Sequence, residues 1–555
     1  MEAITQLAAG KVKGRKFHLP NGDPFYSYKG IPYAQPPIGA LRFKPPIALE
    51  KFDDVILDCS YERNSCYSLS SCPSSVAVSE DCLYANVYTP LSPNEAGLQK
   101  NLPVMVWVHG GAFGAGSGES SMYNPRPLIQ QGVIVVTFNY RLGPFGFLCL
   151  PSANIYGNMG LKDQRMLLRW VHDNISHFGG DPSNVTIFGE SAGGASVHLL
   201  YLSESCKPYY HKAICQSGVA VSCWVEQQAS EANAINLAKR LGCTSTSCDE
   251  VYDTLMTASG PDLLMHSDEN LINWDKSGLR FYSFTPVVEP NNADDPFLTE
   301  NYIDIICKPN LNTVPLMLGI TSNEGMCFAP YLLQLPDLFS NDPERYVPPQ
   351  LPLSNDQRYI VGEEIKRFYF GEKKVSPETI SSLLEYVSDC MFVIPALVAS
   401  ELHSRYQHRA PQYFYRFAFK SELNFITSLV NAATDKALNI DGATHGDDLS
   451  YLFDSEFLGE TELFNSDAIK FRQITIQLWT NFAKFANPTP TKEQIGCIWC
   501  PVQPIDVKQK DYPLQVLNLA DPVEMVFNPF EARVDFWKQL FAKFGGNYLD
   551  HCIVK

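Results

Sequence analysis

A serine between two glycines, in the pattern G-x-S-x-G at residues 189–193, is the first candidate for chemistry in this sequence. The pattern stands where a strand-like apolar stretch (184–188) gives way to a helix-like stretch (192–202). A sharp turn between strand and helix lifts a serine above a sheet, and small neighbours let the helix approach the strand. The helix N-terminus also offers N–H groups and a partial positive charge to a developing anion. A chance match is the alternative, but this context favours Ser191 as a nucleophile for acyl transfer.

A serine hydroxyl needs a base, and the base needs a partner that orients it. His445 lies in the small-residue loop GATHGDD, and Glu324 lies in TSNEG, directly after a strand-like run. The chain order serine, acid, histidine is that of the α/β-hydrolase fold. His172, His177 and His198 fall within helix-like stretches, where packing or surface roles are the simpler interpretation. We therefore predict that His445 is the general base and that Glu324 orients it.

A glycine-rich loop, VHGGAF at residues 108–113, follows another strongly apolar run. Backbone of this kind can aim N–H groups at the oxyanion of a tetrahedral intermediate, together with the N–H of Ala192, the residue after the nucleophile. Each such donor is typically worth about 10²–10³ in rate. A simple glycine turn is the alternative, and it is weak because nucleophile, acid, base and loop occur together in the expected order.

Buried strands and covering helices must position these residues. Residues 102–111 and 132–141 are almost continuous apolar runs, typical of strands covered by helices on both sides. Residues 161–178 repeat apolar positions at helical spacing. Further strand-like runs cover residues 212–218, 314–321 and 412–419. The alternation predicts an α/β architecture of the α/β-hydrolase type, with a large, mostly parallel central sheet and helices on both faces.

The length of 555 residues alone suggests three or four domains. The candidate catalytic residues are spread from Ser191 to His445, however, and can meet only inside one catalytic domain. We therefore expect one domain over residues 1–555, with the Pro-rich stretch 335–353 as a loop excursion rather than a linker.

The net charge is −17, from 43 basic and 60 acidic residues, and no basic run offsets it. Such a surface repels nucleic acid and anionic membranes. The N-terminal sequence lacks the apolar core of a secretory signal, and the most apolar run, 133–150, is interrupted by Asn139 and Arg141. Cys552 begins the outline of a prenylation box, but a final lysine fits that signal poorly. We expect a cytoplasmic protein, with secretion as the alternative, and neither a membrane span nor a nucleic-acid partner.

Sixteen cysteines in a chain of this length do not form a small disulfide scaffold. Cys497 and Cys500 form a lone C-x-x-C, whereas a structural zinc site needs four ligands. We expect most of the cysteines to be reduced and to serve as small apolar groups. No metal or cofactor is expected.

The chain resembles the type-B carboxylesterases, the carboxylesterase/cholinesterase family, over nearly its whole length. The segments that carry the resemblance are YKGIPYAQPPIGALRF, SEDCLYANVYTP, HGGAF, NYRLGPFGFL, GNMGLKDQ, FGGDPSNVTIFGESAGG, TSNEG and GATHGDDLSYLF. The resemblance implies that Ser191, Glu324 and His445 form a catalytic triad. It also implies oxyanion-hole donors at three positions, namely Gly111, Ala112 and Ala192.

Further residues match family positions outside the triad. Glu190 falls where the family keeps a carboxylate beside the nucleophile. Three aromatic residues match positions that line the acyl side of the pocket, although core packing is an equally ordinary use for each: Trp224, Tyr282 and Phe328. Two pairs match structural ion pairs: Arg42 with Glu80, and Arg141 with Asp163. The best counterpart of the family's disulfide loop is Cys66 with Cys82, and a weaker candidate is Cys243 with Cys248.

Ala112 departs from the third glycine that many relatives carry. The donor is a backbone N–H, so alanine keeps it, provided that the backbone there suits a residue with a Cβ. We expect activity to survive this departure, and the substrate range could shift.

The resemblance also narrows the subfamily. Cholinesterases place a tryptophan before the SEDC motif to hold a quaternary ammonium, but residues 66–82 contain none. Juvenile-hormone esterases usually have glutamine where this chain has Glu190, and adhesion members have lost catalytic residues that it keeps. The chain looks most like insect intracellular α-esterases, especially in NYRLGPFGF, GLKDQ and HGDDLSYLF. Such enzymes hydrolyse general carboxylic esters and can be acylated or phosphorylated by ester insecticides.

The resemblance thus implies a hydrolase of general or xenobiotic small-molecule esters, acting as a monomer or homodimer. Two alternatives stay open. One is a dedicated hormone, pheromone or odorant esterase with a narrow pocket. The other is a protein that sequesters esters or organophosphates with slow turnover.

Overall fold

The structure is a computed structural model, and it describes residues 3–545 with gaps. The gaps are residues 54, 70–75, 98–99, 228, 268–281, 310, 312–313, 335–338, 340, 435–437, 439–440, 460–463, 492–494 and 510–511. Cys552 lies outside the described residues, as does part of the Pro-rich stretch.

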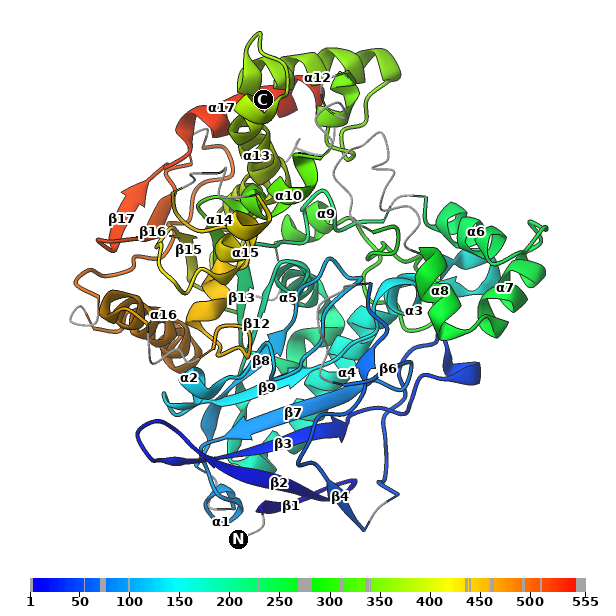
Figure 1. The fold of residues 1–555 in the computed structure, drawn as a ribbon, viewed down its shortest axis with the longest axis vertical. Helices are drawn as coiled ribbons and strands as arrows, with labels where there is room; N and C mark the ends of the chain where they lie inside the picture. Colours follow the sequence, from blue (N-terminus) through cyan, green and yellow to red (C-terminus); the bar gives the residue numbers. More distant parts are fainter. Residues whose placement is uncertain are drawn as a thin grey trace.

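Within the described residues, thirteen strands form one sheet that runs through the molecule (Figure 1). Their order is β1 (Ala3–Leu7), β2 (Gly10–His18), β3 (Pro24–Pro32), β7 (Tyr84–Thr89), β9 (Ile134–Phe138), β8 (Leu102–Val108), β12 (Gly180–Glu190), β13 (Lys212–Gln216), β14 (Leu316–Thr321), β15 (Gln412–Phe417), β16 (Gln515–Leu519) and β17 (Glu524–Phe527), with β4 (Ile56–Asp58) beside β2. The six strands expected from the apolar runs are all present, as β8, β9, β12, β13, β14 and β15.

The centre of the sheet, from β9 to β16, is parallel. Along the order from β1 to β9 and in the pair β16–β17, neighbouring strands are antiparallel, whereas β4 is parallel to β2. Short turns join β1 to β2 and β16 to β17, and such turns connect antiparallel strands, whereas parallel strands need a crossover. The prediction of a mostly parallel central sheet is confirmed, and the structure adds antiparallel edges.

Helices cover both faces of the sheet, because successive side chains of each buried strand point to opposite sides. In β8, Val104 and Val106 pack into one core with α4 (Met159–Asn174), α5 (Ala192–Leu202) and α14 (Ile394–Tyr406). Met105 and Trp107 pack into a second core with α16 (Ser466–Phe485), which lies on the other side of the sheet in Figure 1. This two-sided burial explains why these strands read as continuous apolar runs.

The helical stretch Pro377–Tyr406 contains α13 (Ile380–Ser388), the π-helical turn η9 (Asp389–Val393) and α14. By length and composition it could cross a membrane, but 83% of its apolar window is buried inside the fold, as expected of a core helix. Pro395 explains the π turn, because proline clashes with the carbonyl four residues earlier in a regular helix. The Met391 carbonyl accepts a hydrogen bond from Trp224 Nε1 instead, at 3.0 Å.

Candidate active site

Ser191 lies on the turn between β12 and α5, at the carboxyl end of a central strand. Its φ is +57°, a left-handed conformation that is uncommon for residues other than glycine. The turn is fixed from both sides, since the Ser191 N–H donates to the Gln216 carbonyl at 2.8 Å and the Ser191 carbonyl accepts from Ala195 N–H at 2.9 Å. A Cβ on Gly193 would lie 2.0 Å from the Val108 carbonyl oxygen. The small residues around the serine are therefore required for α5 to approach the sheet.

Glu324 and His445 are brought together from distant parts of the chain. Glu324 begins the short helix η6 (Glu324–Phe328) just after β14, and it is completely buried. Its Oε1 accepts the N–H of Thr321 at 2.7 Å, and its Oε2 lies 2.7 Å from His445 Nδ1. A carboxylate bound to Nδ1 fixes the ring and leaves Nε2 available for proton transfer.

The loop that carries His445 is held by Asp447, a residue to which the sequence analysis gave no role. The Asp447 carboxylate accepts from Thr444 N–H at 2.8 Å and from both the N–H and the hydroxyl of Thr427, at 3.1 and 2.5 Å. The Asn323 N–H donates to the Ala443 carbonyl at 2.9 Å, which ties this loop to that of the acid. Two aspartates, two and three residues after the histidine in HGDD, were the available signal.

His445 Nε2 faces Glu190 in this structure, with Nε2 and Glu190 Oε1 3.1 Å apart. Among the described residues, Ser191 Oγ forms no hydrogen bond. Burial raises the pKa of Glu190 to about 8, despite the opposing effect of His445. Burial alone would lower the pKa of His445, but Glu190, Glu324 and Asp448 outweigh it and raise that pKa to about 9. His445 is therefore held toward its protonated form, which cannot accept a proton.

The loop after β8 lies against Ser191. A Cβ on Gly110 would lie 3.1 Å from the Ser191 Cβ. Gly111 has φ +106° and Ala112 has φ +51°, so alanine occupies a left-handed conformation here. Within the described residues, the backbone N–H groups of Gly111, Ala112 and Ala192 have no hydrogen-bond acceptor. Unpaired donors next to a serine can bind a developing oxyanion.

Aromatic side chains form a wall around His445. Phe392, from the π turn η9, packs on the imidazole with the ring centroids 4.4 Å apart. Phe328 and Trp224, both predicted to line the pocket, lie 6.2 and 6.0 Å from Phe392 between ring centroids. Tyr282 lies against Gly114, the residue that follows the glycine-rich loop. Phe392 was missed, because nothing in its local sequence distinguishes it from a core residue.

Comparison with known protein families identifies the family of this chain. A family model described as "Carboxylesterase family" matches residues 1–537. This chain belongs to the carboxylesterase family. With this fold and site, it is a serine carboxylesterase.

Similar enzymes come from insects and bacteria. The carboxylesterase is 32% identical to a carboxylic ester hydrolase of Bombus ignitus, over 96% of this chain and 93% of the relative. It is 36% identical to a para-nitrobenzyl esterase of Bacillus subtilis, over 88% and 90%. A crystal structure of juvenile hormone esterase from Manduca sexta, with OTFP covalently attached, superposes with a TM-score of 0.86 at 29% identity, covering 98% of this chain and 100% of that one.

One disulfide and two ion pairs that the family resemblance implies are present in the carboxylesterase. Cys66 and Cys82 are joined by a disulfide, whereas Cys243 and Cys248, the weaker candidate pair, are both free thiols. The two ion pairs implied by the family resemblance are also formed: Arg42 with Glu80, and Arg141 with Asp163.

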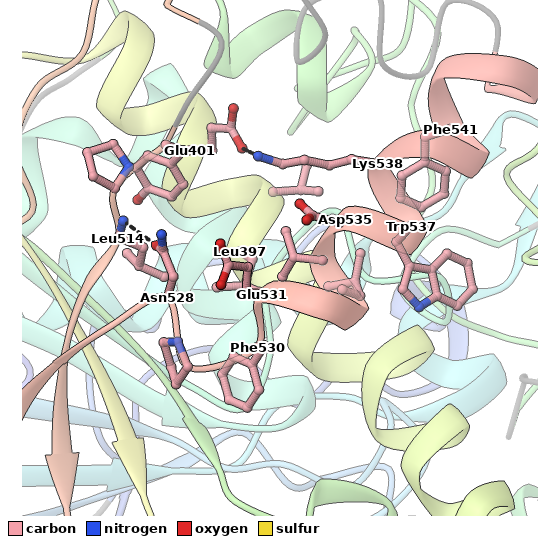
Figure 2. A pocket seen from close by; sticks show the side chains of 16 residues that line it. Leu397, Glu401, Leu514, Asn528, Phe530, Glu531, Asp535, Trp537, Lys538 and Phe541 are labelled. Atoms are coloured by element: carbon pink, nitrogen blue, oxygen red, sulfur yellow. Dashed lines mark hydrogen bonds and ion pairs between the residues drawn. The ribbon is translucent and has the colours of Figure 1, made fainter. Parts of the chain in front are cut away.

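A well-formed cavity of about 320 Å³ lies away from the triad of the carboxylesterase (Figure 2). It is lined by α14 and by α17 (Glu531–Phe544), and none of Ser191, Glu324 and His445 belongs to its lining. Ser191 and Glu324 instead follow the carboxyl ends of β12 and β14, and His445 lies in the loop before η10 (Asp447–Tyr451). The cavity is therefore separate from the chemistry.

Proposed function

We propose that this carboxylesterase hydrolyses carboxylic esters by two-step acyl transfer, with Ser191 as the nucleophile, His445 as the general base and Glu324 as the acid that orients it. His445 takes the serine proton as the hydroxyl oxygen attacks the ester carbonyl, and the alcohol leaves with that proton. Water, activated by His445, then hydrolyses the acyl-enzyme and restores the serine.

The contact of 2.7 Å between Glu324 Oε2 and His445 Nδ1 carries this proposal. It supports the tautomer in which neutral His445 holds its proton on Nδ1, so that Nε2 can accept the proton of Ser191. For this transfer His445 Nε2 must leave Glu190 and form a hydrogen bond with the Ser191 hydroxyl. Catalytic hydrogen bonds that are long in a free enzyme often shorten when substrate binds. The unpaired N–H groups of the glycine-rich loop support a role in holding the carbonyl oxygen.

As substrates we propose general or xenobiotic esters, of the kind met in insecticide detoxification. The aromatic wall around His445 supports an apolar acyl group, because aromatic side chains bury large apolar surfaces. A panel of acetates, longer acyl esters and juvenile hormone tests this part. Similar kcat/KM values across the panel are expected, whereas a single dominant ester would indicate a dedicated hormone, pheromone or odorant esterase.

The mechanism is tested with a p-nitrophenyl ester, by following the burst and the steady state in the protein and in Ser191→Ala. Turnover should fall by about 10⁶-fold in the variant, since triad residues act as a unit. Ser183→Ala, an exposed serine on the same strand, is the matched control and should keep full activity. Normal turnover in a folded Ser191→Ala would disprove the assignment. A burst of one equivalent without turnover would indicate sequestration instead.

A further inference from the structure

The cavity between α14 and α17 has the size and lining of a ligand site. An engineered cavity of about 150 Å³ holds one benzene, so the 320 Å³ of this cavity would hold roughly a dozen non-hydrogen atoms. Most of its wall is apolar. The side chains that make this wall come from three segments of the chain: Leu397 and Val398 on α14, Leu514 just before β16, and Phe530, Val534 and Phe541 at the start of α17 and along it. The wall therefore fits an apolar body.

Two of the charged groups at the cavity, Glu401 and Lys538, are paired with each other, and Glu401 is shared with a second cation, Arg405. Glu401 is buried, and its Oε1 accepts from Arg405 Nη2 at 2.5 Å. Its Oε2 pairs with Lys538 Nζ at 3.2 Å, a contact drawn as a dashed line in Figure 2. The ammonium of Lys538 is thus occupied, and it is not free to hold an anion.

The other two charged groups are carboxylates without partners. Glu531 and Asp535 both line the cavity, and they stand four residues apart on α17, hence on one face of the helix. Figure 2 shows both carboxylates beside the apolar wall. Neither forms an ion pair or a side-chain hydrogen bond with any residue that the structure describes. Both carboxylates are exposed, so the cavity has an apolar wall and two solvent-exposed, unpartnered carboxylates on its rim, on a chain whose net charge is −17.

We propose that this cavity binds an organic ammonium ion with an apolar body of about a dozen non-hydrogen atoms. The apolar part lies against the wall formed by α14 and α17, and the ammonium lies between Glu531 and Asp535. A carboxylate of the same shape is repelled by the rim, and a neutral alcohol gains the apolar contact alone. A bare metal cation is disfavoured, because the wall supplies it with few oxygen ligands.

Three probes of one shape test the proposal: 4-phenylbutylamine, 4-phenylbutanol and 4-phenylbutyrate. Binding is measured by calorimetry on the full chain after Ser191 has been blocked with an organophosphate, so that the active site does not contribute. The amine should bind about tenfold more tightly than the alcohol, because two carboxylates each contribute about a fewfold gain near water. The butyrate should bind most weakly. Added salt should weaken amine binding and leave alcohol binding unchanged.

Variants measure separately how much the rim carboxylates and the apolar wall contribute to binding. Glu531→Gln with Asp535→Asn should lower amine affinity to that of the alcohol, while esterase activity before blocking stays normal. Asp249→Asn with Asp253→Asn removes an exposed pair of the same spacing on α7 (Cys248–Thr257) and should change nothing. Val534→Trp fills the cavity and should abolish binding of both probes. Equal affinity of amine and butyrate, or an amine affinity unchanged by loss of the rim carboxylates, would overturn the proposal.

Discussion

Glu190 Oε1 lies 3.1 Å from His445 Nε2, at the nitrogen that the nucleophile must reach. The carboxylate next to the serine therefore competes with that serine for the histidine. Because Glu190, together with Glu324 and Asp448, raises the pKa of His445 to about 9, the charge of Glu190 affects how much neutral His445 is present. The first prediction concerns this effect.

Glu190→Gln should move the acidic limb of the kcat/KM profile to lower pH. Histidine acts as base only when it is neutral, so activity of the native enzyme rises as pH passes the raised pKa. Removing the Glu190 charge leaves only Glu324 and Asp448 to oppose the effect of burial, so the pKa of His445 falls and its neutral form persists to more acidic pH. The measurement is kcat/KM against pH with an uncharged ester. Glu372→Gln, at an exposed position, is the control and should keep the native profile. An acidic limb of Glu190→Gln that stays in place or moves to higher pH would contradict the prediction.

Ala112 should tolerate glycine but not valine. At φ +51° the alanine is in a left-handed conformation, which costs L-residues roughly 1–2 kcal/mol. Ala112→Gly removes that strain and should keep kcat/KM within severalfold. A β-branched residue at this φ is a genuine outlier, so Ala112→Val should shift the loop and misplace its N–H. Loss of one donor lowers kcat by about 10²–10³, and equal activity of the two variants would show that this N–H is not used.

Phe392→Ala should lower kcat about tenfold with a small change in KM, because the imidazole loses the ring that packs on it and can leave its productive position. Phe392→Leu keeps an apolar side chain on the imidazole, so its kcat should lie between that of Phe392→Ala and that of the native enzyme. Rates are normalised to active sites by titration of the burst, so that partial unfolding does not count as loss of catalysis. A normal kcat per active site in Phe392→Ala would rule out a positioning role.

The buried pair His198 and His403 should make the protein sensitive to acid. Their Nε2 atoms lie 2.8 Å apart, and the Ala220 N–H donates to His198 Nδ1 at 3.0 Å. Burial lowers the pKa of both, that of His403 from 6.5 to about 3. Between these values the unfolded chain binds a proton that the folded chain does not, so the free energy of unfolding falls as pH falls, by about 1.4 kcal/mol per pH unit for each histidine.

His403→Gln should therefore unfold with a shallower dependence on pH below 6.5 than the native protein. Urea unfolding at several pH values between 7.5 and about 5 measures how the free energy of unfolding changes with pH. Throughout this range the pH stays well above the lowered pKa of His403. His172→Gln, a change at a half-exposed side chain, is the control and should keep the native slope. An unchanged dependence of stability on pH in His403→Gln would mean that His198 and His403 do not cause the sensitivity to acid.

The sequence by itself determined the order and type of the main elements. The strands β8, β9, β12, β13, β14 and β15 could be predicted because burial on both faces demands apolar residues at every position. The turn at Ser191 could be predicted because a helix can approach a strand there only if its neighbours are small, as at Gly193. These requirements act on consecutive residues, so they leave a local pattern. For residues that lie outside any such pattern, only the family resemblance indicated a role.

Tertiary structure alone decided the contacts of His445. Its ring meets Glu324 from the end of β14, Glu190 from the end of β12 and Phe392 from a π turn that Pro395 imposes on a long helix. The left-handed backbone of Ala112 likewise follows from the path of its loop, not from its side chain. Distances of this kind depend on where separate elements pack against one another. No spacing along the chain encodes them, because the residues involved are neighbours only after folding.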